Sequence, residues 1–207
     1  MEITPTKDLK NIIEQSITQS MTYQDYRELV KQLSDNNSTT GESKTDALAN
    51  YTILNNRRMK RWDKTIKVDE EAVNKISKIT TKTTWLVLTE SWCGDAAHLM
   101  PVMNKLAELN DNIDFKVLLR DENEALMDRF LTNGGRSIPK LIMIEDETKS
   151  IINTFGPRPS EATRLVNDYK SKHGGLSPEF KEELQHWYNK DKGQTAIKDL
   201  LELSKED

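Results

Sequence analysis

The sequence has only one cysteine, Cys93, among its 207 residues. A single cysteine cannot form a disulfide within the chain, so nothing in the sequence indicates an oxidising compartment. The chain has three histidines, His98, His173 and His186, and the spacing of these residues does not match a zinc site. We therefore expect no metal ion and no cofactor.

The sequence also lacks a long apolar run and a positive net charge. It has no stretch of about 18 apolar residues that could cross a membrane. The polar segment 1–10 lacks the apolar core of a signal peptide. The net charge of −4 argues against nucleic acid as the main partner. We therefore expect a cytoplasmic protein without a membrane partner, and the 31% of charged residues indicates long solvated helices.

Apolar residues recur at helical spacing near both ends of the chain. Residues 1–67 are predicted to form a helical N-terminal extension, with a break near Ser20. Residues 173–207 are predicted to form a helical C-terminal extension after a His-Gly-Gly linker. Its apolar stripe consists of Phe180, Leu184, Trp187 and Tyr188. Both extensions are expected to pack on a central domain, although either apolar stripe could instead form a homo-oligomer interface.

The central residues 68–172 alternate between strand and helix patterns. Apolar runs at 84–89, 113–119, 141–144 and 151–155 predict four strands, with helical segments before, between and after them. This order predicts an α/β domain with a mixed four-stranded sheet and helices on both faces. The short connection after residue 144 makes the last two strands an antiparallel hairpin.

Cys93 lies between the first predicted strand and a helix, in the motif Trp92-Cys93-Gly94-Asp95-Ala96. A thiol in the first turn of a helix is near unpaired backbone N–H groups and the positive end of the helix dipole. Both effects favour the thiolate, which is the reactive form. The alternative is that Cys93 is a small apolar residue that only fills space, as many free cysteines do.

Several residues around this motif occur in the order seen in the thioredoxin-like superfamily. They are Trp92-Cys93-Gly94, Pro101, Arg136-Ser137-Ile138-Pro139 and Gly156. Thioredoxins have Trp-Cys-Gly-Pro-Cys at a strand-to-helix turn and a helix-kinking proline eight residues after the first cysteine, as Pro101 is here. They also have a cis-proline before a strand and a glycine that closes the last strand. The chain therefore resembles this superfamily over roughly 70–172, and in particular a group of bacterial thioredoxin family proteins of poorly defined role.

The differences from thioredoxin limit the chemistry that the resemblance implies. Ala96 stands where thioredoxins have the second cysteine, which releases the product. Asp95 replaces the proline between the cysteines, and its charge should raise the pKa of Cys93. Val87 stands where thioredoxins have a buried acid for proton transfer. The resemblance therefore implies a monothiol site without the thioredoxin proton relay.

The resemblance also implies which residues form the site. Cys93 would be the catalytic nucleophile, and Asp95 would tune its pKa. Trp92 would form a wall of the substrate groove, and Gly94 would allow a substrate backbone to come close. Backbone groups of Ile138, before the cis-proline Pro139, would pair with the substrate chain.

Other residues have weaker functional interpretations. His98 lies five positions after Cys93 and is poorly placed on a helix for a Cys–His pair. Arg136 and Arg158 could bind an anion such as glutathione, or could be surface ion partners. The basic run 57–61 is expected to be a solvated helix face. Glu90 replaces the threonine expected in peroxiredoxins, and the Cys-Gly-Phe-Ser motif of monothiol glutaredoxins is absent, so neither family nor an iron–sulfur cluster is expected.

The sequence supports one leading function and two alternatives. The leading hypothesis is a monothiol redox protein in cell redox homeostasis, a thiol–disulfide oxidoreductase without a resolving cysteine. Cys93 would form mixed disulfides with a protein or a low-molecular-weight thiol. The first alternative is a non-catalytic protein-interaction module in which Cys93 is incidental. The second is a redox sensor that dimerises through oxidised Cys93.

Overall fold

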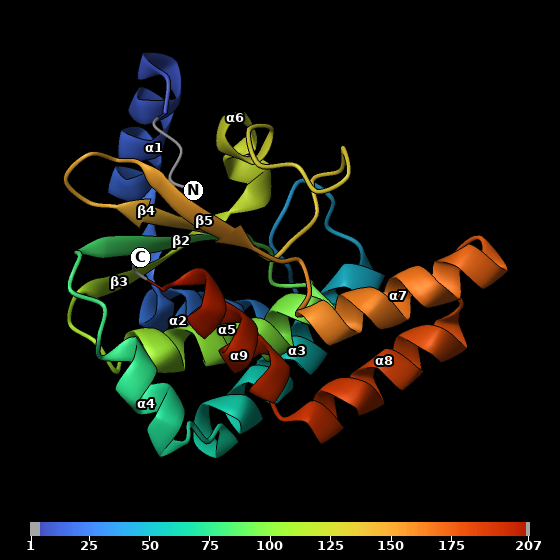
Figure 1. The fold of residues 1–207 in the computed structure, drawn as a ribbon. Coiled ribbons are helices and arrows are strands. Elements are labelled where there is room, and N and C mark those ends of the chain that lie inside the picture. Colours follow the sequence, from blue (N-terminus) through green and yellow to red (C-terminus); the bar gives the residue numbers. More distant parts are fainter. Residues whose placement is uncertain (1–4, 206–207) are drawn as a thin grey trace.

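The fold is built around a mixed sheet with helices on both faces (Figure 1). The computed structural model describes residues 5–205. The strand order is β1-β3-β2-β4-β5, with β2 parallel to β3 and antiparallel to β4, and β4 antiparallel to β5. The bounds are β1 Met21–Thr22, β2 Thr83–Thr89, β3 Ile113–Leu119, β4 Lys140–Glu145 and β5 Ile151–Phe155. The predicted α/β fold and its four central strands are confirmed.

The edge strand β1 was not predicted. It has two residues and pairs antiparallel with β3, with Met21 opposite Val117. A two-residue strand has no measurable periodicity, and the pattern around it is helical on both sides. It occupies the predicted helix break near Ser20, between α1 (Lys7–Gln19) and α2 (Tyr23–Asp35).

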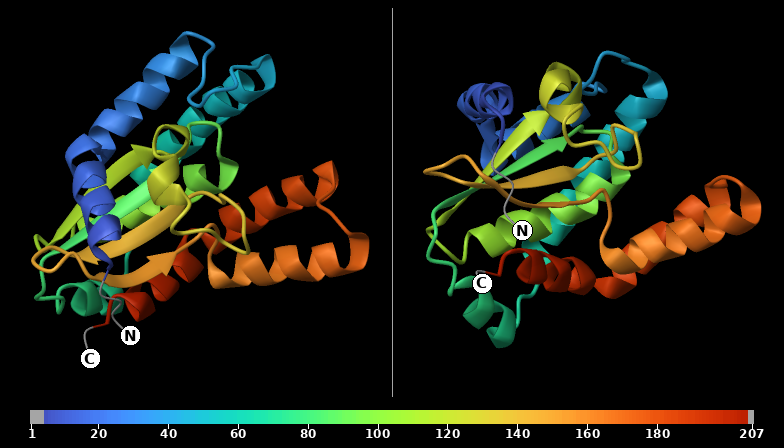
Figure 2. Two further views of the ribbon diagram at one scale, coloured as in Figure 1. Left: turned by 90° about the horizontal axis from the view of Figure 1, so that it is seen from above. Right: turned by 45° about the horizontal axis from the view of Figure 1, so that its top comes forward.

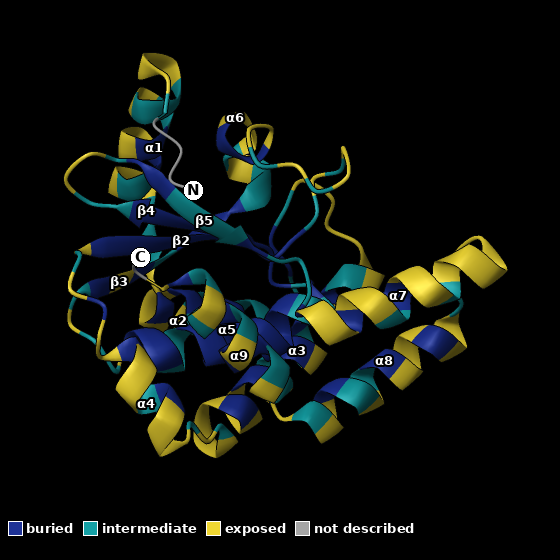
Figure 3. Ribbon diagram, viewed as in Figure 1, coloured by how far each residue is buried: buried dark blue, intermediate teal, exposed yellow. Residues whose placement is uncertain are grey.

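Helices cover both faces of the sheet. Helices α1 and α6 (Glu124–Met127) lie above the sheet in Figure 1, and α2, α3 (Asp46–Thr65), α4 (Glu70–Ile76), α5 (Gly94–Ala107) and α9 (Gln194–Leu203) lie below it. Every residue of β2 is buried (Figure 3). A strand that is covered on both faces needs a continuous apolar run, which Trp85 to Leu88 supplies.

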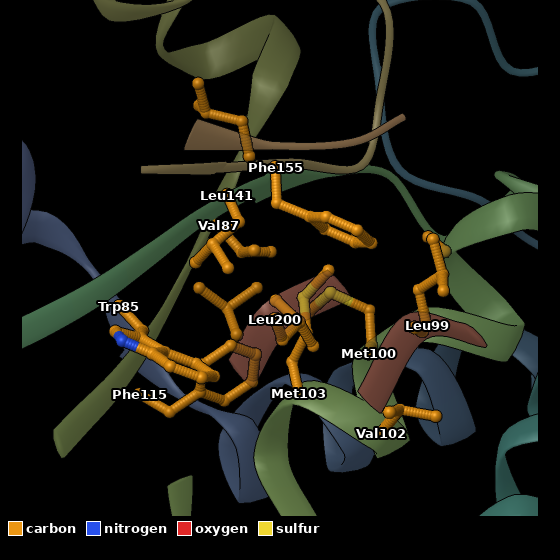
Figure 4. Close-up of a cluster of buried hydrophobic side chains, with 14 of the residues drawn as sticks. Trp85, Val87, Leu99, Met100, Val102, Met103, Phe115, Leu141, Phe155 and Leu200 are labelled. Atoms are coloured by element: carbon orange, nitrogen blue, oxygen red, sulfur yellow. The ribbon is translucent and has the colours of Figure 1, made fainter. Parts of the chain in front are cut away.

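Residues from all three predicted regions share one buried cluster. It includes Tyr26 and Trp85 as well as Leu200 near the end of the chain. Figure 4 shows Val87, at the position where thioredoxins have an acid, among apolar side chains such as Leu141. The predicted division at 67/68 and 172/173 therefore runs through a shared core, and residues 1–4 and 206–207 of the two predicted extensions lie outside the described residues.

Helices α7 (Ser160–His173) and α8 (Pro178–Asp191) form an antiparallel arm that projects from the domain (Figures 1 and 2). At the tip of the arm, Tyr169 stacks on Phe180 with 4.0 Å between ring centroids, and its hydroxyl lies 3.0 Å from Ser177 Oγ. In the predicted stripe of α8, Phe180, Leu184 and Tyr188 are buried. None of the helices in residues 5–205 is both long and apolar enough to cross a membrane.

Candidate functional site at Cys93

Cys93 lies at the strand-to-helix turn that the sequence predicts. It is the N-cap residue of α5, and its backbone N–H donates to Glu90 O at 3.1 Å. The Cys93 sulfur accepts a hydrogen bond from the backbone N–H of Ala96 at 3.5 Å. The thiol therefore occupies the place where a helix N-terminus offers unpaired N–H groups.

The chain segment before β4 forms the opposite side of the site. The Ile138–Pro139 peptide bond is cis. The Cys93 thiol lies 3.3 Å from the carbonyl oxygen of Ile138 and donates to it. Gly156 packs behind this turn with φ +105°, where a Cβ atom would lie 2.2 Å from Pro139 O. Only glycine fits this position, and the predicted residues Cys93, Ile138 and Pro139 do come together.

The thiol itself is covered. Cys93 is only 7% exposed. Burial, and to a smaller extent the negative charge of Asp95, raise its pKa to about 12, while backbone N–H groups and Arg158 oppose the shift. Burial therefore outweighs the helix N-terminus, and the thiol is protonated at neutral pH.

Asp95 links α5 to two distant parts of the chain. One carboxylate oxygen lies 2.7 Å from Arg158 Nη2, and the other accepts a hydrogen bond from the Tyr188 hydroxyl at 2.8 Å. Burial raises the pKa of Asp95, and Arg158 and Tyr188 partly offset this rise. Arg158, a candidate anion ligand in the sequence, is thus the ion partner of Asp95. Arg136, the other candidate, forms ion pairs with Asp128 and Glu124 on the surface.

His98 joins α5 to α3 and α8. It accepts from Trp62 Nε1 at 2.8 Å, its other ring nitrogen lies 2.8 Å from Gln185 Oε1, and its ring stacks on Tyr188 at 4.4 Å. Burial lowers its pKa to about 4. These contacts hold His98 as a neutral structural group. Tyr188 and Gln185 were missed as site residues because their partners are far away in the sequence.

The segment before Cys93 is held by the N-terminal region. Ser91 Oγ lies within 3.2 Å of the hydroxyls of Thr39, Thr40 and Thr52. The Thr40 backbone N–H donates to Ser91 Oγ at 3.0 Å, and Asn55 Nδ2 donates to Ser91 O at 2.9 Å. Thr39 and Thr40 lie in the polar segment 34–41, which has no periodic pattern, so this network was not predicted.

Glu90 and Trp92 lie on the same side of the loop. The Glu90 carboxylate is buried and accepts the backbone N–H of Asp121 at 2.9 Å, and burial raises its pKa. Trp92 is half-buried, with the Arg120 guanidinium 5.1 Å from its ring centroid. Gly94 begins α5, and a Cβ atom there would lie 3.7 Å from Arg58 Nη1. The basic helix α3 therefore reaches the Cys93 loop.

A sequence profile described as thioredoxin matches residues 41–170. The chain belongs to the thioredoxin family. This match begins earlier than the predicted resemblance at 70–172 and includes α3, which packs on α5, the helix that begins after Cys93. Membership supports a general thioredoxin-like function.

Two solved structures share the thioredoxin-like fold of this family member. A Pseudomonas aeruginosa protein of unknown function is 18% identical, with a TM-score of 0.57 over 72% of this chain and 83% of its own. An HIV epitope-scaffold is 17% identical, with a TM-score of 0.55 over 88% of this chain and 97% of its own. No curated protein matches the chain. Within residues 5–205 of this family member, no group of three or more His, Cys, Asp or Glu side chains could hold a metal ion.

Proposed function

We propose that this thioredoxin family member is a cytoplasmic monothiol redox protein whose Cys93 forms mixed disulfides with a protein or a low-molecular-weight thiol. One observation carries the proposal. The Cys93 sulfur lies in the first turn of α5 and 3.3 Å from the carbonyl of Ile138, the residue before cis-Pro139. The proposal is supported because, in this family, the backbone at that residue would pair with a substrate chain.

The reaction has two exchange steps. The Cys93 thiolate attacks a substrate disulfide, so one substrate sulfur bonds to Cys93 and the other leaves as a thiolate. Ala96 has no sulfur to resolve this mixed disulfide, so an external thiolate must attack it. That thiol ends in a disulfide with the substrate sulfur, and Cys93 leaves as a thiolate.

The cover over the site sets the condition for this chemistry. Cys93 is 7% exposed, and the pKa of its thiol is about 12. The hydrogen bond from Tyr188 and the ion pair with Arg158 hold Asp95 beside the thiol. We infer that the resting form reacts slowly, and that the thiol reacts faster when the Tyr188 hydroxyl no longer holds Asp95 in place.

The same burial favours a second function, a non-catalytic interaction module. A covered and protonated thiol is typical of a cysteine that only fills space. In that case Trp92, Gly94, Ile138 and Pro139 would bind a partner segment without sulfur chemistry.

Glutathione disulfide separates the two functions. Native protein is incubated with it at pH 8, and the adduct on Cys93 is followed by mass spectrometry, with Cys93→Ser as the blank. We expect an adduct that forms faster in Tyr188→Phe by about fivefold, the factor for roughly 1 kcal/mol from one lost hydrogen bond. The matched control, Tyr169→Phe, removes a tyrosine hydrogen bond at the arm tip and should leave the rate unchanged. If the rate of adduct formation equals the rate of global unfolding in the wild type and in every variant that keeps Cys93, the non-catalytic module is established.

A further inference from the structure

We infer that the exposed face of α3 is a docking surface for an acidic polypeptide segment that carries an apolar side chain. The surface, called the α3 face below, consists of Tyr51, Leu54, Arg57, Arg58 and Arg61. The inference goes beyond the proposed redox function, because binding there requires no reaction of Cys93.

The apolar part of the α3 face is unusually open. Tyr51 is 50% exposed and Leu54 is 41% exposed, and they are two of the three large apolar side chains that are exposed in residues 5–205. They lie three positions apart on one helix, so their side chains are neighbours. An exposed aromatic and aliphatic pair of this kind favours contact with an apolar partner side chain.

The charged part of the α3 face lacks carboxylate partners. Within the described residues, Arg57, Arg58 and Arg61 have no carboxylate within ion-pair distance, whereas the other arginines each have at least one. Arg58 donates to Asn55 Oδ1 at 3.1 Å, and Arg61 donates to Asn189 Oδ1 at 2.5 Å. Both acceptors are neutral amides, and only Arg58 is near enough to a carboxylate, that of Asp95, for partial charge compensation without an ion pair.

Partial burial makes the charge on Arg58 energetically unfavourable, because the guanidinium loses part of its contact with water. Arg58 is half-buried, and burial together with the nearby Arg61 charge lowers its pKa. In a chain of net charge −4, three adjacent unpaired guanidinium groups are a local exception. A carboxylate from a partner would accept the bidentate hydrogen bonds that arginine offers and compensate the charge.

The position of the α3 face connects it to the Cys93 loop. Residues 51, 54, 58 and 61 fall at spacings of three and four, so they follow one side of α3. Arg58 at the middle of this side reaches the start of α5, where a Cβ at Gly94 would lie 3.7 Å from its Nη1. A segment bound along the α3 face would therefore pass beside the start of α5.

Nucleic acid is a poorer candidate for the same surface. The negative net charge of the whole chain repels a polyanion at long range. A short acidic segment needs only local complementarity, and exposed Tyr51 and Leu54 provide contacts for its apolar side chain. The proposed occupant is therefore a peptide segment with several carboxylates around one large apolar residue.

Fluorescence anisotropy tests the docking surface with the full-length protein. The probe is a fluorescein-labelled twelve-residue peptide with glutamates on both sides of a central Trp-Leu pair, and its glutamine counterpart is the matched neutral probe. We expect the acidic probe to bind at least about tenfold more tightly than the neutral one, and to weaken when salt is raised from 50 to 200 mM. Equal binding of the two probes would overturn the inference.

Variants then place the binding site. We expect Arg57→Glu with Arg61→Glu to weaken binding by about tenfold or more, and Leu54→Ser by about threefold. The control, Lys170→Glu with Lys172→Glu, reverses two charges on the distant helix α7 and should leave affinity unchanged. Cys93→Ser should also bind normally, so loss of redox activity and loss of docking are measured separately. A single-stranded DNA that competes as well as the peptide, or a dimer that Leu54→Ser dissociates, would also overturn the inference.

Discussion

The two sides of the Cys93 loop are held in different ways. On the upstream side, Ser91 is bound by neutral hydroxyl and amide groups, and its residue exposure is 1%. On the downstream side, Asp95 is bound by an ion pair and a phenol, and its side chain is 12% exposed. The upstream contacts come from the N-terminal region, and the downstream contacts come from the segment after β5 and from α8.

This difference separates stability from reactivity. Buried neutral hydrogen bonds are costly to break, because each broken bond leaves a polar group without water. A carboxylate beside a thiol acts on the pKa of that thiol, whatever it contributes to folding. We therefore expect changes on the upstream side to alter the free energy of unfolding, and changes at Asp95 to alter the chemistry of Cys93.

The largest expected effect is on the pH dependence of stability at His98, on the downstream side. Burial lowers the pKa of His98 from 6.5 to about 4, so the unfolded state binds a proton first as pH falls. The contribution of neutral His98 to the free energy of unfolding is fully present above pH 6.5 and is lost as the pH falls towards 4. This loss amounts to about 3 kcal/mol in total. Urea unfolding at pH 7 and pH 4 should show this extra loss in the wild type relative to His98→Gln.

The comparison with His98→Gln is needed because two acids act in the opposite direction. The pKa values of Glu90 and Asp95 are raised in the folded state, so these groups favour folding at low pH. Both variants contain these acids, and their contribution cancels. Parallel pH curves for the two proteins would refute the neutral, buried state of His98.

The next effect in size is a loss of stability on the upstream side. Ser91→Ala leaves the Thr40 backbone N–H and nearby hydroxyls without their acceptor, which should cost about 2 kcal/mol in the free energy of unfolding. Urea unfolding measures this loss. The matched control is Ser171→Ala, at an exposed serine in α7. If the folded Ser91→Ala variant also reacted faster at Cys93 than the wild type does, the proposed separation between the two sides would fail.

The smallest effect is on the rate of Cys93 alkylation. Asp95→Asn removes the charge that raises the pKa of Cys93, and one pKa unit corresponds to about tenfold more thiolate. We expect the iodoacetamide rate at pH 7.5 to rise by up to about tenfold. Asp128→Asn breaks a surface pair with Arg136 and serves as the control. An unchanged rate in Asp95→Asn would mean that access to the sulfur alone limits the reaction.

The sequence predicted the parts of the site that depend on local pattern and on family resemblance. The buried strand before Cys93, the helix after it and the proline turn at 138–139 were identified because each has a short signature. The contacts that hold Ser91 and Asp95, on the two sides of the thiol, were not predicted. Tyr188 and Asp95 are 93 positions apart, and Tyr188 looked like any other member of an amphipathic stripe. Thr39 and Thr40 looked like loop residues because hydrogen bonds to Ser91 leave no periodic pattern.

The chain that follows the arm also returns to the core. After α8, Gly193 adopts φ +79° and packs so closely that a Cβ atom would lie 2.7 Å from Val102 Cγ2. Helix α9 then buries Leu200, and Asn153 Nδ2 donates to Leu203 O at 2.9 Å. Helix α8 is therefore a span fixed at both ends, by α7 and by α9. A protease cut in the open Gly174–Gly175 linker would not release it, and the cut would leave α8 joined to the domain through α9 alone.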